Sequence, residues 1–148
     1  GDLTGDENLR FHARLFGLDD IEGRIAYVAD SVGITANLRQ KTGTLSHGMQ
    51  KRLSIARALL HDPPILLLDE PETGLDQNAL TMLERLVKEW SGQRRAVLMA
   101  THNLDRALAI GSRVVILARG TVAYEQSLEK VGPDVVRNAY FEHTGERL

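Results

Sequence analysis

Hydrophobic positions recur at helical spacing through the first third of the chain, and capping residues mark where the expected helices begin. Thr4 followed by Glu7 has the form of a capping box, which predicts a helix to about Phe16. Asp19 followed by Glu22 repeats this arrangement before a second apolar stripe. The chain is therefore expected to open with two short amphipathic helices.

The next part of the chain alternates between helical patterns and short apolar runs. Ser46 is expected to cap a helix over residues 48–60, and a proline pair then prevents its continuation. Uninterrupted apolar runs at 65–68 and 96–100 lie on either side of a helical stripe at 77–90. Such runs are typical of parallel strands that are buried on both faces, with helices above and below.

The last third of the chain carries weaker patterns. They predict a short helix at 105–110, a hairpin of strands 114–117 and 121–125 turned at Arg119-Gly120, and a helix after Pro133. Together the patterns predict an α/β fold in which parallel strands are flanked by helices. Residues 1–44 are expected to form a helical subdomain, and residues 45–148 the α/β part of the same domain.

Composition narrows the classes of function. The 148 residues are 43% hydrophobic with a formal net charge of -2, which suits a globular domain and offers no bulk charge for nucleic acid, so no nucleic-acid partner is expected. Basic clusters at Lys51, Arg52 and Arg57, and at Arg94-Arg95, are expected to be solvated surface. The absence of cysteine excludes disulfides, and no apolar run reaches the roughly 20 residues that span a bilayer.

Two acidic residues follow the first apolar run. The carboxyl ends of parallel strands are where α/β sheets bind ligands, and Asp69 and Glu70 stand at that point. Asp69 fits a ligand of Mg²⁺ in phosphoryl transfer, and Glu70 fits a general base or a group that orients the attacking water. Taken alone, the same residues fit a strand that runs into a polar turn.

Two further segments carry candidate chemistry. His102 follows the second apolar run, so its ring could reach the same sheet edge and donate to a γ-phosphate oxygen or hold the attacking water. Ser46 and Gly48 stand at the start of a helix, where backbone N–H groups and the helix dipole favour an anion. Taken alone, these features are more often a structural histidine and an ordinary helix cap.

The order of these segments resembles the ATP-binding cassette (ABC) ATPase family. Residues 45–50 resemble its signature motif, residues 65–69 its Walker B strand and residues 71–76 its D-loop. The signature departs from the commonest form of the motif, because Met49 stands where glutamine is usual and Gln50 follows it. We take this departure as the mark of a subtype found in exporters, and it leaves the role of Gln50 open.

The resemblance implies a role for each candidate residue. Three residues would act on ATP held by the same subunit: Asp69 as the Mg²⁺ ligand, Glu70 as the catalytic glutamate and His102 as the switch histidine. Asp69 would bind the ion through water. Those expected to contact ATP held by a second subunit are Ser46, Gly48 and Gln50. Asp76 would lie at the dimer contact. ATP and Mg²⁺ are therefore the expected cofactors.

The phosphate loop of this family, Gly-x-x-x-x-Gly-Lys-Ser/Thr, does not occur in the sequence. The chain is therefore expected to be a partial P-loop NTPase core, one incomplete domain that begins just after the glutamine with which the family senses its membrane partner. Without the backbone donors and lysine of that loop, we expect the chain alone to be inactive. We also expect an exposed apolar face or open sheet edge that favours self-association.

The subtype is expected to be an exporter. Residues 3–11 and 101–106 look like the ATP-binding subunit of haem exporters in cytochrome c biogenesis, although many multidrug and polysaccharide exporters share these features. The implied partners are a second ATPase subunit, as a homodimer or heterodimer, and a transmembrane subunit contacted by the helical subdomain. The implied location is cytoplasmic, peripheral on the inner face of the cell membrane.

Two other hypotheses stay open from the sequence. One is a soluble ABC-type ATPase of DNA repair or translation, although the chain carries no coiled coil, second cassette or strongly basic insert typical of that class. The other is a non-catalytic interaction module, which the presence of Glu70 and His102 argues against. The transported substrate cannot be read from this chain, because selectivity belongs to the membrane subunit.

Overall fold

A computed structural model describes residues 2–92 and 95–145 of the chain. The chain divides into two compact units, Gly1–Ala100 and Thr101–Leu148, and each unit is described by itself. Among the described residues, no helix has both the length and the apolar character needed to cross a membrane.

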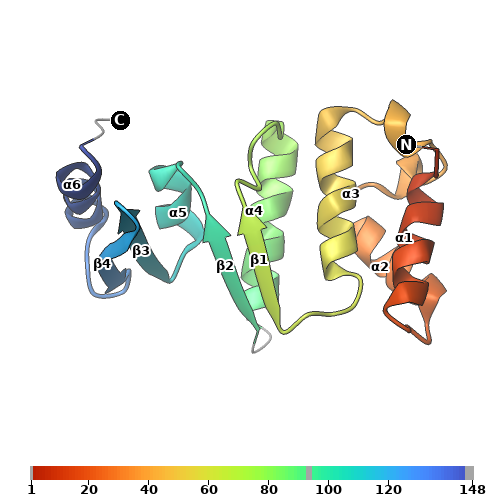
Figure 1. Cartoon of the computed structure of the whole chain (residues 1–148), viewed down its shortest axis with the longest axis horizontal. Helices are drawn as coiled ribbons and strands as arrows, with labels where there is room; N and C mark the ends of the chain where they lie inside the picture. The colour runs from red at the N-terminus through yellow and green to blue at the C-terminus, as the bar shows by residue number, and fades with distance from the viewer. Residues whose placement is uncertain (1, 93–94, 146–148) are drawn as a thin grey trace. The chain divides into compact units, whose positions relative to one another are not determined.

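The first unit begins with helices that pack against one another in pairs: α1 (Gly5–Leu15), α2 (Ile21–Ser31) and α3 (His47–Leu59) (Figure 1). Two 3₁₀ turns, η1 (Thr35–Asn37) and η2 (Thr42–Thr44), lie between α2 and α3. The apolar residues that the sequence places at helical spacing form the buried core, among them Leu9, Ile25, Val28, Leu53 and Leu59. Helices α1 and α2 lie within residues 1–44, and the predicted helical subdomain stays a prediction.

The predicted capping box at the start of α1 is confirmed. The Thr4 backbone N–H donates to Glu7 Oε2 at 2.8 Å, and the Glu7 N–H donates to Thr4 Oγ1 at 3.2 Å. These hydrogen bonds, that from the Thr4 backbone first, hold the pKa of the Glu7 carboxyl below its ordinary value. Helix α1, Gly5–Leu15, thus begins and ends close to the predicted positions.

The predicted cap of the second helix is wrong by one residue. Asp20, and not Asp19, caps α2, because its carboxylate accepts from the Gly23 N–H at 2.9 Å. Any side chain at position 23 would overlap that carboxylate, so the glycine allows the close approach. Glu22 instead pairs with Arg10 of α1, which lowers the pKa of the Glu22 carboxyl.

Backbone hydrogen bonds join the two ends of the segment that contains α1 and α2. The Thr42 N–H donates to Leu3 O at 2.9 Å, and Thr4 forms an isolated antiparallel bridge with Lys41. One residue further along, the Gly5 N–H donates to Gln40 O at 3.1 Å. The chain therefore enters and leaves the helical subdomain at neighbouring points.

The first unit ends in a parallel pair of strands, β1 (Ile65–Asp69) and β2 (Ala96–Ala100), joined through α4 (Gln77–Ser91). Helix α4 packs against β2 (Figure 1). The expectation that both faces of these strands are buried is wrong. Alternate side chains of the pair are exposed, with Ile65 at 59%, Leu67 at 69% and Leu98 at 65%, because side chains alternate across a strand and only the other set is covered.

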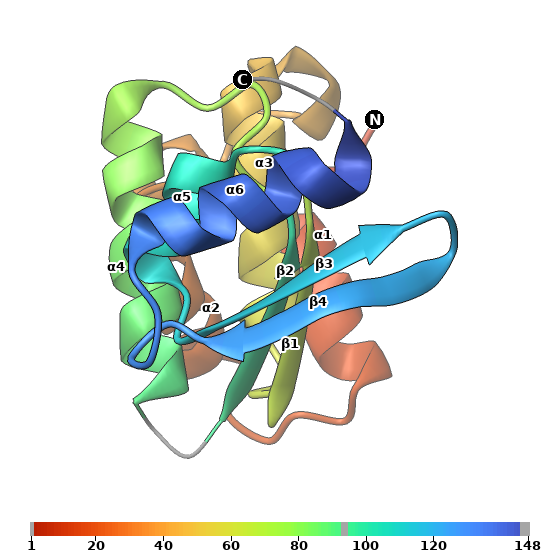
Figure 2. The same cartoon turned by 90° about the vertical axis from the view of Figure 1, so that its left-hand side faces the viewer.

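The second unit contains α5 (Leu104–Ile110), a hairpin of β3 (Arg113–Ala118) and β4 (Thr121–Ser127), and α6 (Pro133–Thr144). The predicted hairpin is confirmed, and Arg119 and Gly120 at its turn both have positive φ. Helix α6 lies along the hairpin and packs on β3 (Figure 2). A small core around Leu104, Val114 and Val136 holds this unit together.

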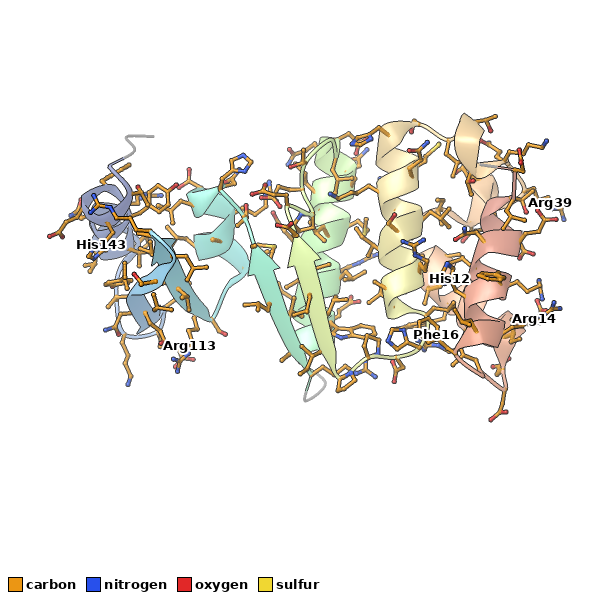
Figure 3. All side chains as sticks on the ribbon, in the orientation of Figure 1. His12, Arg14, Phe16, Arg39, Arg113 and His143 are labelled. Carbon is orange, nitrogen blue, oxygen red and sulfur yellow. The ribbon has the colours of Figure 1, made fainter. Side chains whose placement is uncertain are left out.

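Stability of the first unit is expected to fall as the pH drops from about 7.5 to 5.5. Burial, and then the charge of Arg57, lowers the pKa of His12 on α1 (Figure 3), so the unfolded chain binds its proton near pH 6.5 while the folded chain does not. Urea unfolding at both pH values measures this loss, and His12→Gln should make it smaller. An unchanged loss in that variant would contradict the assignment to His12.

Candidate functional site

The N-terminus of α3 forms one side of the candidate site. Ser46 caps the helix, with its Oγ accepting from the Met49 N–H at 3.3 Å, so its own O–H stays available to donate to a ligand. The first backbone N–H groups of any helix have no partner within the helix, and here they belong to His47 and Gly48. Gly48 adds no side chain that would block the approach of an anion.

A hollow of about 380 Å³ lies beside this helix terminus. Residues from α3, from the turn after α2 and from the loop before α4 line it, among them Ser46, Gly48, Arg52, Gly74 and Asp76. The structure thus brings together two of the three predicted signature residues, Ser46 and Gly48, and the predicted D-loop aspartate. All of them belong to the first unit.

Asp76 has a structural role that the sequence did not reveal. It caps α4, since its Oδ1 accepts from the Ala79 N–H at 2.8 Å, and it lies 3.8 Å from Arg52 Nη2. Its side chain is nevertheless 75% exposed, which leaves it open to a partner. The predicted dimer contact through Asp76 stays a prediction.

Asp69 and Glu70 lie where the sequence places them, at the carboxyl end of β1. Asp69 is exposed and pairs in register with Ala100 of β2. Glu70 follows in the left-handed region, with φ of 44°, which costs a residue with a β-carbon about 1–2 kcal/mol. Its N–H donates to Ala100 O at 2.9 Å, and its side-chain Oε2 accepts from Thr73 Oγ1 at 3.5 Å.

The basic residues of α3 correct the prediction that they are solvated surface. Lys51 is half-buried and donates from Nζ to the Glu70 carbonyl at 2.8 Å. Arg52 is also half-buried and donates from Nη1 to Val32 O at 2.9 Å, while Arg57 is exposed as expected. Sequence reasoning missed the first two, because a basic residue one turn into a helix gives no signal of which carbonyl it meets. Of the second cluster, Arg94 lies outside the described residues.

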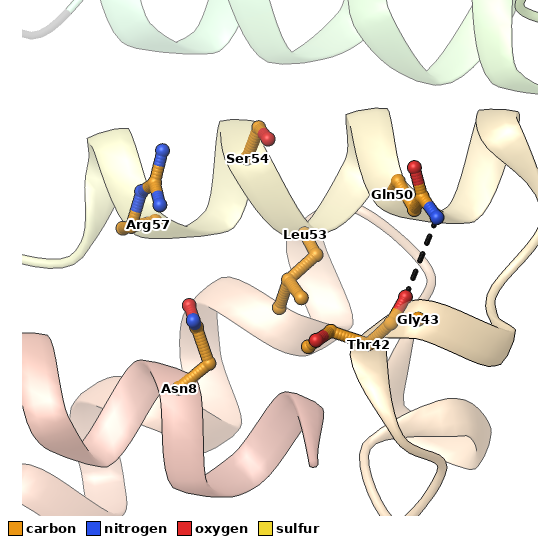
Figure 4. A pocket seen from close by; sticks show the side chains of 7 residues that line it. All are labelled: Asn8, Thr42, Gly43, Gln50, Leu53, Ser54 and Arg57. Atoms are coloured by element: carbon orange, nitrogen blue, oxygen red, sulfur yellow. Dashed lines mark hydrogen bonds between the residues drawn. The ribbon is translucent and has the colours of Figure 1, made fainter. Parts of the chain in front are cut away.

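Gln50 lies in a different place from Ser46 and Gly48. Its Nε2 donates to Leu45 O at 3.1 Å and to Thr42 O at 3.4 Å, and it lines a second hollow of about 310 Å³ (Figure 4). Asn8 of α1 and Leu53 of α3 line the same hollow. The structure therefore does not bring Gln50 into the hollow beside the α3 terminus, and its contact with ATP stays a prediction.

His102 is the second residue of the second unit and lies two residues after the end of β2. It sits exposed in a short turn in which the Asn103 N–H donates to Thr101 Oγ1 at 2.9 Å. Asn103 then caps α5 by accepting from the Arg106 N–H at 3.0 Å. The predicted position of His102 just after the second strand is confirmed, and the catalytic role of His102 stays a prediction.

The residues of the first unit fit the groups that the resemblance implies. A serine hydroxyl and helix N–H groups beside an open hollow suit a phosphate. Across residues 2–92 and 95–145, no three His, Cys, Asp or Glu side chains gather as a metal site. The single carboxylate of Asp69 suits Mg²⁺, which is commonly bound through one or two carboxylates together with water and substrate phosphates.

Comparisons with known proteins point to the same family as the resemblance read from the sequence. Residues 2–73 match the family model described as "ABC transporter". The chain is similar to the ABC transporter ATP-binding protein NatA of Bacillus subtilis, at 32% identity over 131 residues that cover 87% of this chain and 53% of NatA. It is also similar to the molybdenum import ATP-binding protein ModC of Haemophilus influenzae, at 39% identity over 128 residues that cover 84% of this chain and 34% of ModC.

A solved structure, titled as the ATP-binding subunit of an ABC transporter, shares the fold with a TM-score of 0.84 and 28% sequence identity. The match covers 95% of this chain and 62% of that one. The chain thus spans about half the length of NatA and less of ModC. The family model over residues 2–73, the relatives and the fold agree: the chain is similar in sequence and structure to the ATP-binding subunits of ABC transporters.

Proposed function

We propose that this chain works in the ATP-binding subunit of an ABC exporter, which couples the binding and hydrolysis of ATP to transport. One observation carries the proposal. The capped terminus of α3 and the D-loop residues Gly74 and Asp76 line the same hollow, and Lys51 ties that helix to the turn at Glu70. A helix terminus ready for a phosphate thus belongs to the same compact unit as the paired acids at the end of β1.

Each residue has a proposed action in this function. Ser46 would donate its hydroxyl, and Gly48 its backbone N–H, to the phosphates of ATP bound to a second subunit; Gln50 is assigned to the same contact. Bound ATP supplies the phosphoryl group, and Mg²⁺ offsets its charge. Asp69 holds that ion through water, and Glu70 accepts the proton of the attacking water. His102 is proposed to donate to the transferred phosphoryl group.

Two partners are proposed. A second ATPase subunit, identical or different, would meet this chain at Asp76, whose side chain is open to solvent. A transmembrane subunit would dock on the helical subdomain, where Phe11 is 58% and Leu15 69% exposed on α1. With such a partner the protein would lie on the cytoplasmic face of the cell membrane, and no nucleic-acid partner is proposed.

The proposed transported substrate is haem. Haem export in cytochrome c biogenesis rests on residues 3–11 and 101–106. The names of similar proteins include a molybdenum import ATP-binding protein and a retinal-specific phospholipid-transporting ATPase, so they favour no single substrate or direction. Export is proposed from the form of the signature motif, and haem stays a prediction.

The proposed function is tested by supplying a phosphate loop. We expect the purified 148-residue chain to show no ATP hydrolysis, because its sequence contains no Gly-x-x-x-x-Gly-Lys-Ser/Thr cradle. Joined behind the N-terminal part of an ABC ATP-binding subunit that carries this loop, the chain should bind and hydrolyse ATP. Steady-state phosphate release and equilibrium binding of a fluorescent ATP analogue measure both outcomes.

The control is the same chimera with its phosphate-loop lysine replaced by alanine, which should lose hydrolysis. A folded chimera that neither binds nor hydrolyses ATP would overturn the proposed function. Hydrolysis by the isolated chain that disappears on Glu70→Gln would instead overturn the expectation that the chain alone is inactive.

A further inference from the structure

The segment from Glu70 to Asp76 is fastened to helix α3 at three points. Lys51 donates from Nζ to the Glu70 carbonyl at 2.8 Å. The ring of His47 packs on Gly74 so closely that a β-carbon there would overlap it. Arg52 lies 3.8 Å from Asp76. All three attachments come from residues within the first two turns of α3.

The attachment at Glu70 differs from the other two, because it acts on a backbone that is held in an unfavourable conformation. The Glu70 carbonyl also accepts from the Thr73 N–H at 3.3 Å, which is a weak turn bond. A charged donor at 2.8 Å is a stronger partner for that carbonyl than a neutral amide. The ammonium of Lys51 is therefore the firmest contact of the Glu70 carbonyl, and it comes from another element.

We propose that Lys51 is a positioning residue that holds the turn of Glu70 in place and joins it to α3. The inference deepens the proposed function, since Glu70 is the proposed catalytic carboxylate. Lys51 does not touch ATP in this role. It fixes the main chain from which the Glu70 carboxylate extends, so that the carboxylate stays in one place relative to the end of β1.

A consequence follows for the two ATP sites of a dimer. The terminus of α3, at Ser46, is proposed to contact ATP on the second subunit, whereas Glu70 acts on ATP of its own subunit. Through Lys51, one helix would then contact one ATP and hold the carboxylate that acts on the other. A displacement of α3 would move Glu70 as well, which is a physical link between the two sites.

The test uses nuclear magnetic resonance on the full chain without nucleotide, so that its result does not depend on the proposed function. In Lys51→Met, which keeps the length but removes the donor, we expect the Glu70 ¹³C and ¹⁵N resonances to shift. The Thr73 amide hydrogen should exchange about tenfold faster, which corresponds to about 1.4 kcal/mol. Lys51→Arg should restore both values, because it keeps a charged donor.

The matched control is Lys88→Met on the exposed face of α4, which should leave Glu70 and Thr73 unchanged. Unchanged Glu70 resonances in Lys51→Met would overturn the inference, as would a failure of Lys51→Arg to restore them. If Lys51→Met does not fold, Lys51→Gln replaces it, and the same comparison with Lys51→Arg decides the question. Failure of the phosphate-loop chimera would remove the catalytic role of Glu70 and would not alter this result.

Discussion

In the chimera with a phosphate loop, Glu70→Gln is expected to slow ATP turnover about 10²–10⁴-fold while ATP still binds. Glutamine has the size of glutamate but cannot accept the proton of the attacking water at neutral pH. The Glu70→Gln chimera can be compared directly with the unmodified one, because the hydrogen bonds from Lys51 and to Ala100 involve the main chain of residue 70 and not its side chain. The replacement should therefore leave the turn intact and remove the chemistry alone.

Turnover is measured by phosphate release, and binding by titration with ATP in the same buffer. The control is Glu129→Gln in the exposed turn between β4 and α6, which should turn over at the unmodified rate. A Glu70→Gln chimera that hydrolyses ATP as fast as the unmodified one would show that Glu70 is not the base. Loss of binding together with turnover would point to a damaged fold.

The isolated chain is expected to self-associate through the exposed face of β1 and β2. Leu67 and Leu98 lie directly opposite each other in the register of the two strands, at 69% and 65% exposed, and Ile65 adds to the same face. Contiguous apolar surface of this kind is removed from water when copies meet, which favours association by about 25 cal/mol for each Å² buried. Sedimentation velocity should give a mass above the 16.4 kDa of one chain.

Replacing the pair by opposite charges, Leu67→Lys with Leu98→Glu, should return the mass to that of one chain. Opposite charges facing each other across strands stabilise the pairing, so the sheet itself is preserved. Thr81→Lys, on an exposed position of α4, is the control and should leave the association unchanged. A clean monomer for the unmodified chain at every concentration would contradict the prediction.

Local signals in the sequence predicted most of the elements. The capping box at Thr4, the Ser46 cap and the turn at Arg119-Gly120 each depend on a few neighbouring residues, and each appears in the structure. The apolar runs also predicted both parallel strands, because runs of four or five residues have the length of a strand and are too short for a typical helix. Caps and turns that depend on neighbouring residues can therefore mostly be predicted from the sequence before the fold is known.

Contacts between distant segments were not readable. The exception among the local signals is the cap of α2, which Asp20 takes in place of the adjacent Asp19. Lys51 looks like an ordinary surface residue in the sequence, and only the path of the chain after β1 brings a carbonyl to it. The candidate residues were found by their order along the chain, whereas the residues that hold them were found only in three dimensions.

The backbone bridge between Thr4 and Lys41 has a consequence for how such domains diversify. The chain between Thr4 and Lys41 leaves and returns at adjacent points. A few main-chain hydrogen bonds, which do not depend on side chains, offset the entropy cost of closing this loop. A segment of that kind can be exchanged for another with the same two ends while the remaining backbone keeps its course. Such an exchange would alter the surface that α1 and α2 present and leave the course of α3 and β1 unchanged.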